Sequence, residues 1–425
     1  MANRSSKLIR CSFCKRDSRE VLVFPGPDGA NICADCAKEI TKAVESAERV
    51  MSADRKVKLP ELGPVPTPKE IKTFLDSYVI GHDETKRVLS VAVHNHYRRL
   101  EQKENADASG KKAGGKAAVS EFDDVEIEKS NILLIGPTGT GKTLFAKTLA
   151  RMLKVPYAIG DATTLTEAGY VGEDVENLVR YLFQNAGGDV ALASRGIIYV
   201  DEIDKIASKT DNVSITRDVS GEGVQQALLK IIEGTVCRIP PKGGRKHPDQ
   251  DYIEVDTSNI LFICGGAFVG LDRIIGERTG KRTIGYGADD AEDAAETTKA
   301  EPEALDVRPE DLVKFGLIPE FTGRLPVITA MRELTEDQLV KVLTEPKNCL
   351  VKQYRKLLAM DGVDLSFEPE ALRELAKDAI VRKTGARGLR AAMERVMTDI
   401  MYEAPGSKSG IKVVITAEMV KEKLK

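Results

Sequence analysis

The sequence predicts an α/β fold with a mostly parallel sheet that carries helices on both faces. Apolar runs typical of strands alternate with helical patterns between residue 131 and about residue 268, as in successive βαβ units. Beyond Leu334 the pattern becomes helical, apart from a valine-rich strand at 413–415, and two cysteine pairs stand near the N-terminus. We therefore predict four regions: a cysteine-containing N-terminal module at 1–50, a linker at 51–67, a large α/β domain at 68–326 and a small, mainly helical domain at 327–425.

Residues 136–143 have the spacing of a P-loop, G-x-x-x-x-G-K-[ST]. An apolar run at 132–135 precedes the loop like a buried strand, and a helical pattern follows it. Backbone N–H groups of such a loop, with the helix N-terminus behind them, bind phosphate oxygens. The lysine is expected to reach the β- and γ-phosphates of ATP and the threonine to ligate Mg²⁺. The predicted nucleotide-binding residues here are Pro137, Thr138, Gly139, Thr140, Gly141, Lys142, Thr143 and Leu144.

A second apolar run, 197–200, ends in Asp201 and Glu202. Two carboxylates at a strand end could be a solvated charge pair. Beside a P-loop they are better explained by catalysis, with Asp201 in the Mg²⁺ shell and Glu202 as the general base for the attacking water. The pair therefore predicts hydrolysis of the nucleotide as well as its binding.

Four cysteines form two C-x-x-C pairs whose spacing is typical of a zinc site. Four thiolates complete a tetrahedral shell and leave no position for water, so the predicted zinc is structural. Disulfides are the alternative, which a reducing compartment disfavours. The predicted ligands are Cys11, Cys14, Cys33 and Cys36, whereas Cys237, Cys264 and Cys349 are expected to be buried small residues.

The composition of the 425 residues is that of a globular protein, with 42% hydrophobic and 30% charged residues. Net charge is −3 and the pI is near 6.0, so no global basic field exists to hold a nucleic-acid backbone. The N-terminus lacks a signal-peptide pattern, and no run approaches membrane-spanning length. We expect a cytoplasmic protein with neither nucleic-acid nor membrane partners.

The linker ends in a helix-start signal, with Thr67 as N-cap, Pro68 in the first turn and Glu70 completing a capping box. A second helix is expected from Asp83 to about Leu100. Residues 101–120, rich in Ala, Gly and Lys, are expected to form a disordered insertion.

In content and order these motifs resemble those of the ClpX family, the AAA+ protein unfoldases that feed the ClpP peptidase. The resemblance covers nearly the whole chain. Besides the zinc module, the P-loop and Val200-Asp201-Glu202, it is carried by Tyr78-Val79-Ile80-Gly81, Gly323-Arg324-Leu325-Pro326 and Gly385-Ala386-Arg387-Gly388. It implies a homohexamer that unfolds protein substrates and threads them into a ClpP-type peptidase, and a zinc module that recruits substrates and adaptors.

The resemblance also implies roles for single residues around the nucleotide. Val79 and Ile80 would lie against adenine. Arg324 matches the arginine finger that reaches the γ-phosphate bound by the neighbouring subunit. Arg387 matches the sensor-2 arginine, which converts phosphate loss into domain rotation. No sensor-1 residue is assigned, because Cys264 and two glycines follow the strand that usually ends in a polar sensor.

Three further segments match substrate-handling loops of the family, and a fourth its docking tripeptide. On the residues alone, Gly169-Tyr170-Val171-Gly172 could equally be a turn with a core tyrosine. The resemblance assigns Tyr170 and Val171 to the pore-1 loop, Arg217 to the pore-2 loop, Arg245, Lys246 and His247 to the basic loop at the pore entrance, and Ile284, Gly285 and Tyr286 to the peptidase-docking tripeptide.

Two alternative functions stay open on the sequence. A nucleic-acid motor of the AAA+ class is disfavoured by the acidic pI and the lack of a basic, aromatic-interleaved surface. A remodelling chaperone that works without a peptidase is kept open by Tyr286, since the family usually has phenylalanine there.

Overall fold

The computed structural model describes residues 9–26, 29–42, 64–110, 125, 127–166, 173–208, 221–240, 252–279, 306–403 and 411–424. The chain divides into two compact units, Met1–Gly63 and Pro64–Lys425. The predicted pore and docking segments fall outside the described residues, namely Tyr170, Val171, Arg217, Arg245, Lys246, His247, Ile284, Gly285 and Tyr286.

The first unit contains one small antiparallel pair of strands, β1 (Val23–Pro25) and β2 (Asn31–Cys33). Residues 34–42 follow as a helix. Its buried cluster consists of cysteines, against which Val21, Val23 and Ile32 pack while partly exposed. The apolar core of this unit is therefore very small.

The second unit begins with α2 (Pro68–Asp76), where the predicted capping box is confirmed. The Thr67 hydroxyl accepts from the Glu70 backbone N–H, and the Glu70 carboxylate accepts from the Thr67 backbone N–H. The next helix, α3 (Asp83–Gly110), is longer than predicted. Residues 101–110, expected to be disordered, continue this helix. The stretch contains Glu, Gln, Lys and Ala, which are good helix formers.

The predicted parallel sheet is confirmed. Its five strands run in the order β11-β3-β10-β7-β4, and every neighbouring pair is parallel. Strand β11 lies on the C-terminal side of the predicted domain boundary between residues 326 and 327, yet each of its residues pairs with a residue of β3. The sheet therefore extends to Ala330. The strands are β3 (Ile132–Ile135), β4 (Tyr157–Asp161), β7 (Ile197–Asp201), β10 (Leu261–Gly266) and β11 (Val327–Ala330).

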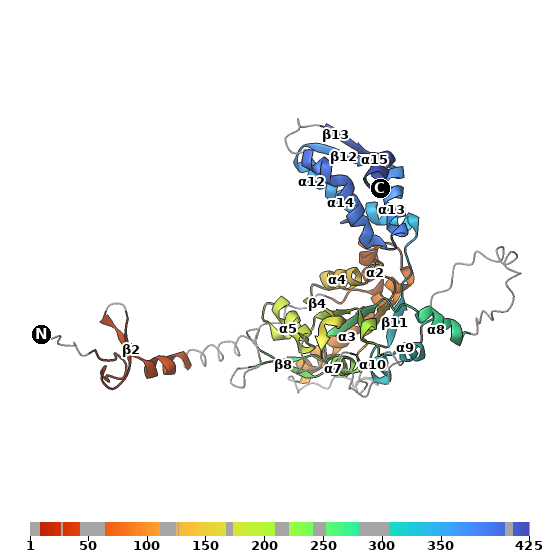
Figure 1. The fold of residues 1–425 in the computed structure, drawn as a ribbon. Coiled ribbons are helices and arrows are strands. Elements are labelled where there is room, and N and C mark those ends of the chain that lie inside the picture. Colours follow the sequence, from red (N-terminus) through yellow and green to blue (C-terminus); the bar gives the residue numbers. More distant parts are fainter. Residues whose placement is uncertain are drawn as a thin grey trace. The chain divides into compact units, whose positions relative to one another are not determined.

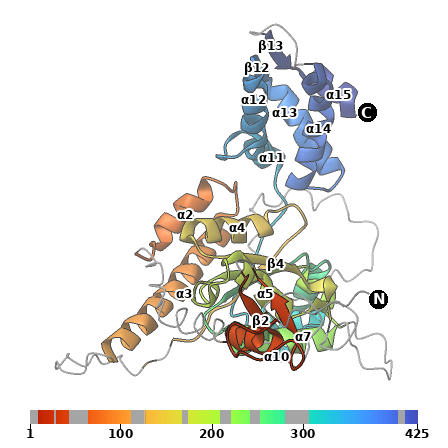
Figure 2. The same ribbon diagram turned by 90° about the vertical axis from the view of Figure 1, so that its left-hand side faces the viewer.

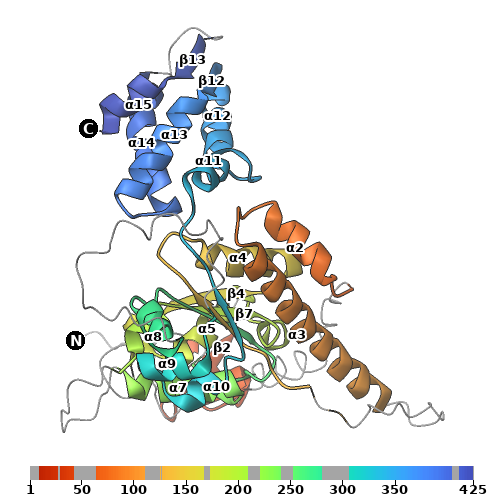
Figure 3. The same cartoon turned by 90° about the vertical axis from the view of Figure 1, so that its right-hand side faces the viewer.

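Both faces of this sheet are covered. Side chains alternate between faces along a strand, and Leu133 and Ile135 join the main core cluster while Ile132 and Leu134 are also buried. Figures 1, 2 and 3 show α2 and α4 on one side of the sheet and α7 and α10 on the other. The helices of this region are α4 (Lys142–Leu153), α5 (Glu176–Asn185), α6 (Val190–Ala193), α7 (Glu222–Glu233), α8 (Leu271–Arg278), α9 (Pro309–Phe315) and α10 (Pro319–Gly323).

Two short strand pairs complete this region: β5 (Leu165–Thr166) with β6 (Glu173–Asp174), and β8 (Val236–Ile239) with β9 (Ile253–Asp256). The first pair is parallel and the second antiparallel.

The C-terminal part is mainly helical, as predicted, and has its own core, which includes Leu343, Leu375 and Met393. The predicted valine-rich strand is confirmed as β13, which pairs in parallel with β12. None of the helices in the described ranges has both the length and the apolar character needed to span a membrane. The elements are α11 (Glu336–Thr344), α12 (Leu350–Met360), β12 (Val363–Phe367), α13 (Pro369–Val381), α14 (Ala386–Glu403), β13 (Ile411–Ile415) and α15 (Ala417–Leu424).

Candidate functional site

The P-loop connects β3 to α4 through backbone conformations that favour glycine. Gly139 and Gly141 have φ values of 86° and 98°, which side-chain-bearing residues rarely adopt. A Cβ at Gly139 would also lie 2.5 Å from the Thr384 carbonyl oxygen. The Gly136 N–H donates to the Gly266 carbonyl at 3.1 Å, which ties the start of the loop to β10.

Lys142 and Thr143 are the first two residues of α4. The Lys142 ammonium donates to the carbonyls of Gly136 and Pro137, at 2.5 and 3.0 Å. Burial lowers the pKa of Lys142, and the nearby Asp201 carboxylate acts in the opposite direction. The Thr143 hydroxyl donates to Asp201 Oδ2 at 3.2 Å. The predicted phosphate-binding lysine and both predicted Mg²⁺ ligands therefore lie side by side.

Asp201 is the last residue of β7, and Glu202 follows it with a left-handed backbone, φ 54°. Non-glycine residues with positive φ are uncommon, and they concentrate at functional sites. The Glu202 N–H donates to Asp201 Oδ1 at 3.0 Å, and the Tyr199 hydroxyl donates to the same oxygen at 3.1 Å. Burial and the Asp201 charge both raise the pKa of Tyr199, so this phenol stays protonated.

A cavity of about 460 Å³ brings most of the predicted site residues together. Arg387 enters it from the first turn of α14, and the Ala386 N–H donates to the Gly139 carbonyl at 3.3 Å. The helical C-terminal part therefore contributes directly to the lining. The predicted residues that line the cavity are Thr138, Gly139, Gly141, Lys142, Thr143, Leu144, Asp201, Glu202 and Arg387.

The predicted adenine contacts, Val79 and Ile80, are not among the lining residues of this cavity. The Val79 carbonyl accepts from the buried Lys86 ammonium at 2.8 Å. Closer to the P-loop, the His82 ring lies 6.3 Å from the Phe145 ring. Burial and the Lys86 charge lower the pKa of His82 to about 4. This segment thus approaches the P-loop through His82.

Two other P-loop residues, Pro137 and Thr140, contact each other within the loop. Pro137 and Thr140 also lie outside the lining of the cavity, and the Thr140 hydroxyl donates to the Pro137 carbonyl at 2.9 Å.

Arg324 also lies outside the lining of this cavity. It follows α10, and its guanidinium Nε donates to Glu233 Oε1 at 2.8 Å. Its backbone carbonyl accepts from Asn131 Nδ2 at 3.0 Å, which ties it to the residue preceding β3. The side chain is half exposed. The arginine is thus firmly anchored but does not reach the P-loop of its own chain.

Sequence reasoning did not identify several residues that line the cavity. Asp204 is nearly buried, and its Oδ1 accepts from the Ala267 N–H at 3.1 Å. In the sequence, the signal that points to Asp204 is a third acid three residues after Asp201. The other residues that sequence reasoning missed line the cavity only because the fold brings their segments to the P-loop: Lys205, Gly266, Ala267, Val269 and Ala386.

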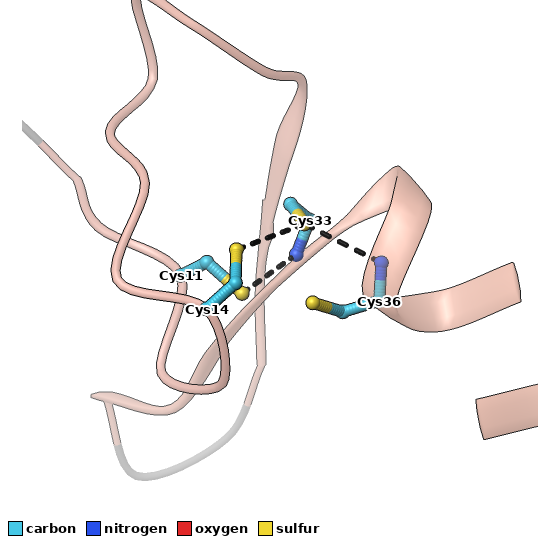
Figure 4. Close-up of side chains that lie close together, drawn as sticks. All are labelled: Cys11, Cys14, Cys33 and Cys36. Carbon is cyan, nitrogen blue, oxygen red and sulfur yellow. Dashed lines mark hydrogen bonds between the residues drawn. The ribbon is translucent and has the colours of Figure 1, made fainter. Parts of the chain in front are cut away.

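The four predicted zinc ligands also come together, in the first unit. Figure 4 shows their sulfur atoms pointing toward a common centre, with Cys36 on the helix and Cys33 at the end of β2. All four sulfurs lie within 4.8 Å of one another. Cys14 Sγ and Cys33 Sγ are 3.6 Å apart, far beyond a disulfide bond of about 2.05 Å. The disulfide alternative is therefore wrong, and all seven cysteines are free.

The electrostatics of this cluster favour a bound cation. Burial acts to raise the pKa of Cys11, but backbone N–H groups of Cys14 and Cys33 hold it at about 6. Hydrogen bonding to Cys33 and burial raise the pKa of Cys36 to about 12. A bound cation would offset the mutual repulsion of four thiolates this close together.

The donor set fits zinc. With Zn–S distances of about 2.3 Å, neighbouring sulfurs of a tetrahedral site lie about 3.8 Å apart, which these positions approach. The Cys33 N–H donates to Cys11 Sγ at 3.2 Å and the Cys36 N–H to Cys33 Sγ at 3.4 Å. Such backbone bonds orient the ligands, as outer contacts do around metal sites.

Comparison with known proteins identifies the family of this chain. Residues 127–328 match the AAA domain (Cdc48 subfamily), and residues 334–415 match the C-terminal, D2-small domain of ClpB protein. The ATP-dependent Clp protease ATP-binding subunit ClpX of Treponema denticola is 52% identical over 420 residues, which cover 98% of this chain and 95% of that protein. The chain belongs to the ClpX family. It is accordingly an AAA+ ATPase that uses ATP and Mg²⁺, and its four-cysteine cluster is compatible with the zinc of this family.

Proposed function

We propose that this protein is an ATP-dependent protein unfoldase and translocase that works in the cytoplasm as a homohexamer and delivers substrates to a ClpP-type peptidase. The observation that carries the proposal is the cavity in which Lys142, Asp201, Glu202 and Arg387 converge. The similarity to a protein named as the ATP-binding subunit of a Clp protease supports the peptidase partner.

In this proposal the P-loop N–H groups and Lys142 bind the phosphates, and Thr143 and Asp201 hold Mg²⁺. The bound ion would neutralise charge on the phosphate oxygens. Glu202 accepts a proton from the attacking water. Its position, one residue after the carboxylate that faces Thr143, places a second acid at the same cavity.

Three further residues connect this chemistry to motion and assembly. Val79 and Ile80 contact the base, and Arg387 couples phosphate loss to movement of the helical C-terminal part. Arg324 acts as the arginine finger on ATP bound by the neighbouring subunit. Its absence from the cavity of its own chain and its anchored backbone support action across an interface.

Substrate handling is assigned to segments outside the described residues. Tyr170 and Val171 would grip the polypeptide, Arg217 would contact it deeper in the pore, and the basic loop at 245–247 would attract acidic groups at the entrance. Ile284-Gly285-Tyr286 would dock the peptidase. The zinc module would recruit substrates and adaptors.

The deciding experiment follows ATP-dependent unfolding of a tagged fluorescent protein, with and without ClpP. We expect unfolding in both cases and degradation only with ClpP. Unfolding without any ClpP binding would instead identify a peptidase-independent remodelling chaperone, which a ClpP pull-down would verify. Salt-sensitive DNA binding with no protein unfolding would contradict both and indicate a nucleic-acid motor.

Mixed rings test the placement of Arg324. Arg324→Ala alone should abolish hydrolysis, because a finger contributes roughly 10³–10⁵-fold in comparable enzymes. Mixing these subunits with Glu202→Gln subunits creates some interfaces in which both halves are intact, so part of the ATPase activity should return. No recovery in verified mixed rings would contradict action in trans.

A further inference from the structure

The two oxygens of the Asp201 carboxylate have different partners. Oδ2 accepts from the Thr143 hydroxyl at 3.2 Å, so it faces the other proposed Mg²⁺ ligand. Oδ1 accepts from the Glu202 N–H at 3.0 Å and from the Tyr199 hydroxyl at 3.1 Å. One oxygen is thus held by two protein donors, while the other points toward the proposed metal position.

The position of Tyr199 makes this contact possible. Residues two apart on a strand share a face, so Tyr199 and Asp201 of β7 lie on the same face of the sheet. The Tyr199 side chain is completely buried. Its hydroxyl donates to Asp201, and the other oxygen of that carboxylate accepts from Thr143, so Asp201 connects the two hydroxyls.

The neighbouring strand leaves space for this hydroxyl. Cys264 of β10 pairs with Val200, and Gly265 follows it. A Cβ built on Gly265 would lie 2.2 Å from the Tyr199 hydroxyl oxygen and 2.9 Å from Cζ. Any side chain at Gly265 would displace the phenol. β10 ends without a polar sensor side chain, and the Tyr199 hydroxyl of β7 occupies the space beside Gly265 instead.

We propose that Tyr199 is a positioning residue that orients the Asp201 carboxylate for Mg²⁺, and that Gly265 is required because the phenol occupies its side-chain space. The inference rests on the proposed role of Asp201 as a Mg²⁺ ligand. Groups that orient metal ligands in this way typically contribute 10–100-fold in metal affinity or activity.

Tyr199→Phe tests the proposal because it removes the hydroxyl and retains the ring. Two quantities are measured on full-length protein: the Mg²⁺ concentration that half-activates the ATPase, and the affinity for a fluorescent ADP analogue with Mg²⁺ and with EDTA. We expect the half-activating Mg²⁺ concentration to rise roughly ten-fold or more. The Mg²⁺-dependent gain in nucleotide affinity should shrink, while the affinity in EDTA should stay within two-fold, roughly the effect of a neutral surface substitution.

Tyr157→Phe is the matched control. The Asp201 charge raises the pKa of this tyrosine of β4, but its buried hydroxyl has no hydrogen-bond partner among the residues that the structure describes. Its removal should leave Mg²⁺ dependence unchanged, since no hydrogen bond is lost. Gly265→Ala provides an independent perturbation, and its effect on Mg²⁺ dependence should not add to that of Tyr199→Phe, because both remove the same contact.

Unchanged Mg²⁺ dependence in both Tyr199→Phe and Gly265→Ala would overturn the inference, as would an equal change in Tyr157→Phe. Equal loss of nucleotide affinity with Mg²⁺ and with EDTA would overturn it too, because that pattern indicates only damaged packing. Asp201→Asn separates this from the proposed function. If Asp201→Asn leaves Mg²⁺ dependence intact, the assigned Mg²⁺ site itself is wrong.

Discussion

The zinc module and the nucleotide-binding sheet reach stability in different ways. In the module, Cys11, Cys33 and Cys36 form the buried cluster, while Phe13 and Leu22 are 61% and 67% exposed. In the central strands β3, β7 and β10 of the sheet, residues on both faces are buried, and charged residues gather at the strand ends. The difference shows that metal–sulfur bonds can stabilise a short segment that lacks an apolar core, whereas a large sheet is stabilised by its apolar core and can carry hydrogen-bonded catalytic groups at its strand ends.

Removal of zinc should give the largest difference between the two regions. Binding of a structural zinc is worth about 10–16 kcal/mol in small zinc-dependent peptides, so Cys33→Ser should unfold residues 9–42 completely. The ATPase rate should stay within two-fold, roughly the effect of a neutral change elsewhere. Hydrogen exchange of residues 9–42, zinc content and ATPase rate are measured together.

Cys349→Ala is the control for the zinc experiment, since Cys349 is buried but lies outside the cluster. It should keep the full zinc content. Absence of zinc from the intact protein, or loss of ATPase activity in Cys33→Ser, would break the contrast between the two regions.

The converse change affects only the sheet region. Glu202→Gln removes the proposed base but leaves the P-loop intact, so ATP should bind while turnover falls by roughly 10²–10⁴-fold. Zinc content should not change. Turnover and nucleotide binding are measured beside Glu277→Gln, an exposed carboxylate on α8 that should have no effect. Residual turnover above a tenth of the parent rate would remove Glu202 from this role.

Lowering the pH should reduce the folding stability of both regions, for different reasons. Protons compete with zinc for the cysteine sulfurs. In the other unit, burial lowers the pKa of His96 to about 3, with the charges of Arg99 and Lys129 contributing. Because the unfolded chain then binds more protons than the folded one between about pH 3 and 6.5, stability rises with pH across this window.

His96→Gln in a Cys33→Ser background isolates the second effect, since no zinc is then released. The free energy of unfolding lost between pH 6.5 and pH 4 should become smaller by about 3 kcal/mol. This follows because a full difference of one bound proton changes it by about 1.36 kcal/mol per pH unit. Urea unfolding followed by circular dichroism at several pH values measures it. His82, whose pKa is also lowered, should still cause part of the loss. If the loss of stability between pH 6.5 and pH 4 is the same with and without His96→Gln, His96 does not contribute to the acid sensitivity.

A local change in the second unit should have the smallest effect. Thr67→Ala removes the N-cap of α2 and should cost about 1 kcal/mol. Thr73→Ala is the matched control, because the Thr73 hydroxyl donates to the Lys69 carbonyl within the same helix and caps no helix end. The two urea midpoints are compared. Equal midpoints would mean that the capping box contributes no measurable stability.

Local patterns predicted several features correctly. The capping box at Thr67, the parallel sheet and the four-cysteine cluster follow from short-range spacing, since caps, strand periodicity and C-x-x-C pairs act within a few residues. The predicted end of α3 near Leu100 is wrong, because the good helix formers at 101–110 continue the helix despite the low complexity of this stretch. The extension of the sheet to Ala330 depended on a pairing with β3, from which it is almost two hundred residues distant.

The sequence by itself determined the family, the phosphate loop, the two acids at the end of β7 and the proposed ligands of the metal site, because each is a fixed set of residue types at fixed spacing. Tertiary structure decided which distant groups meet at those motifs. Arg387 joins the cavity through α14, Glu233 pairs with Arg324, and the Tyr199 hydroxyl reaches Asp201 only because Gly265 on the adjacent strand leaves space. Spacing along a chain encodes local geometry, whereas contacts between strands and helices arise only when burial of their apolar faces brings them together.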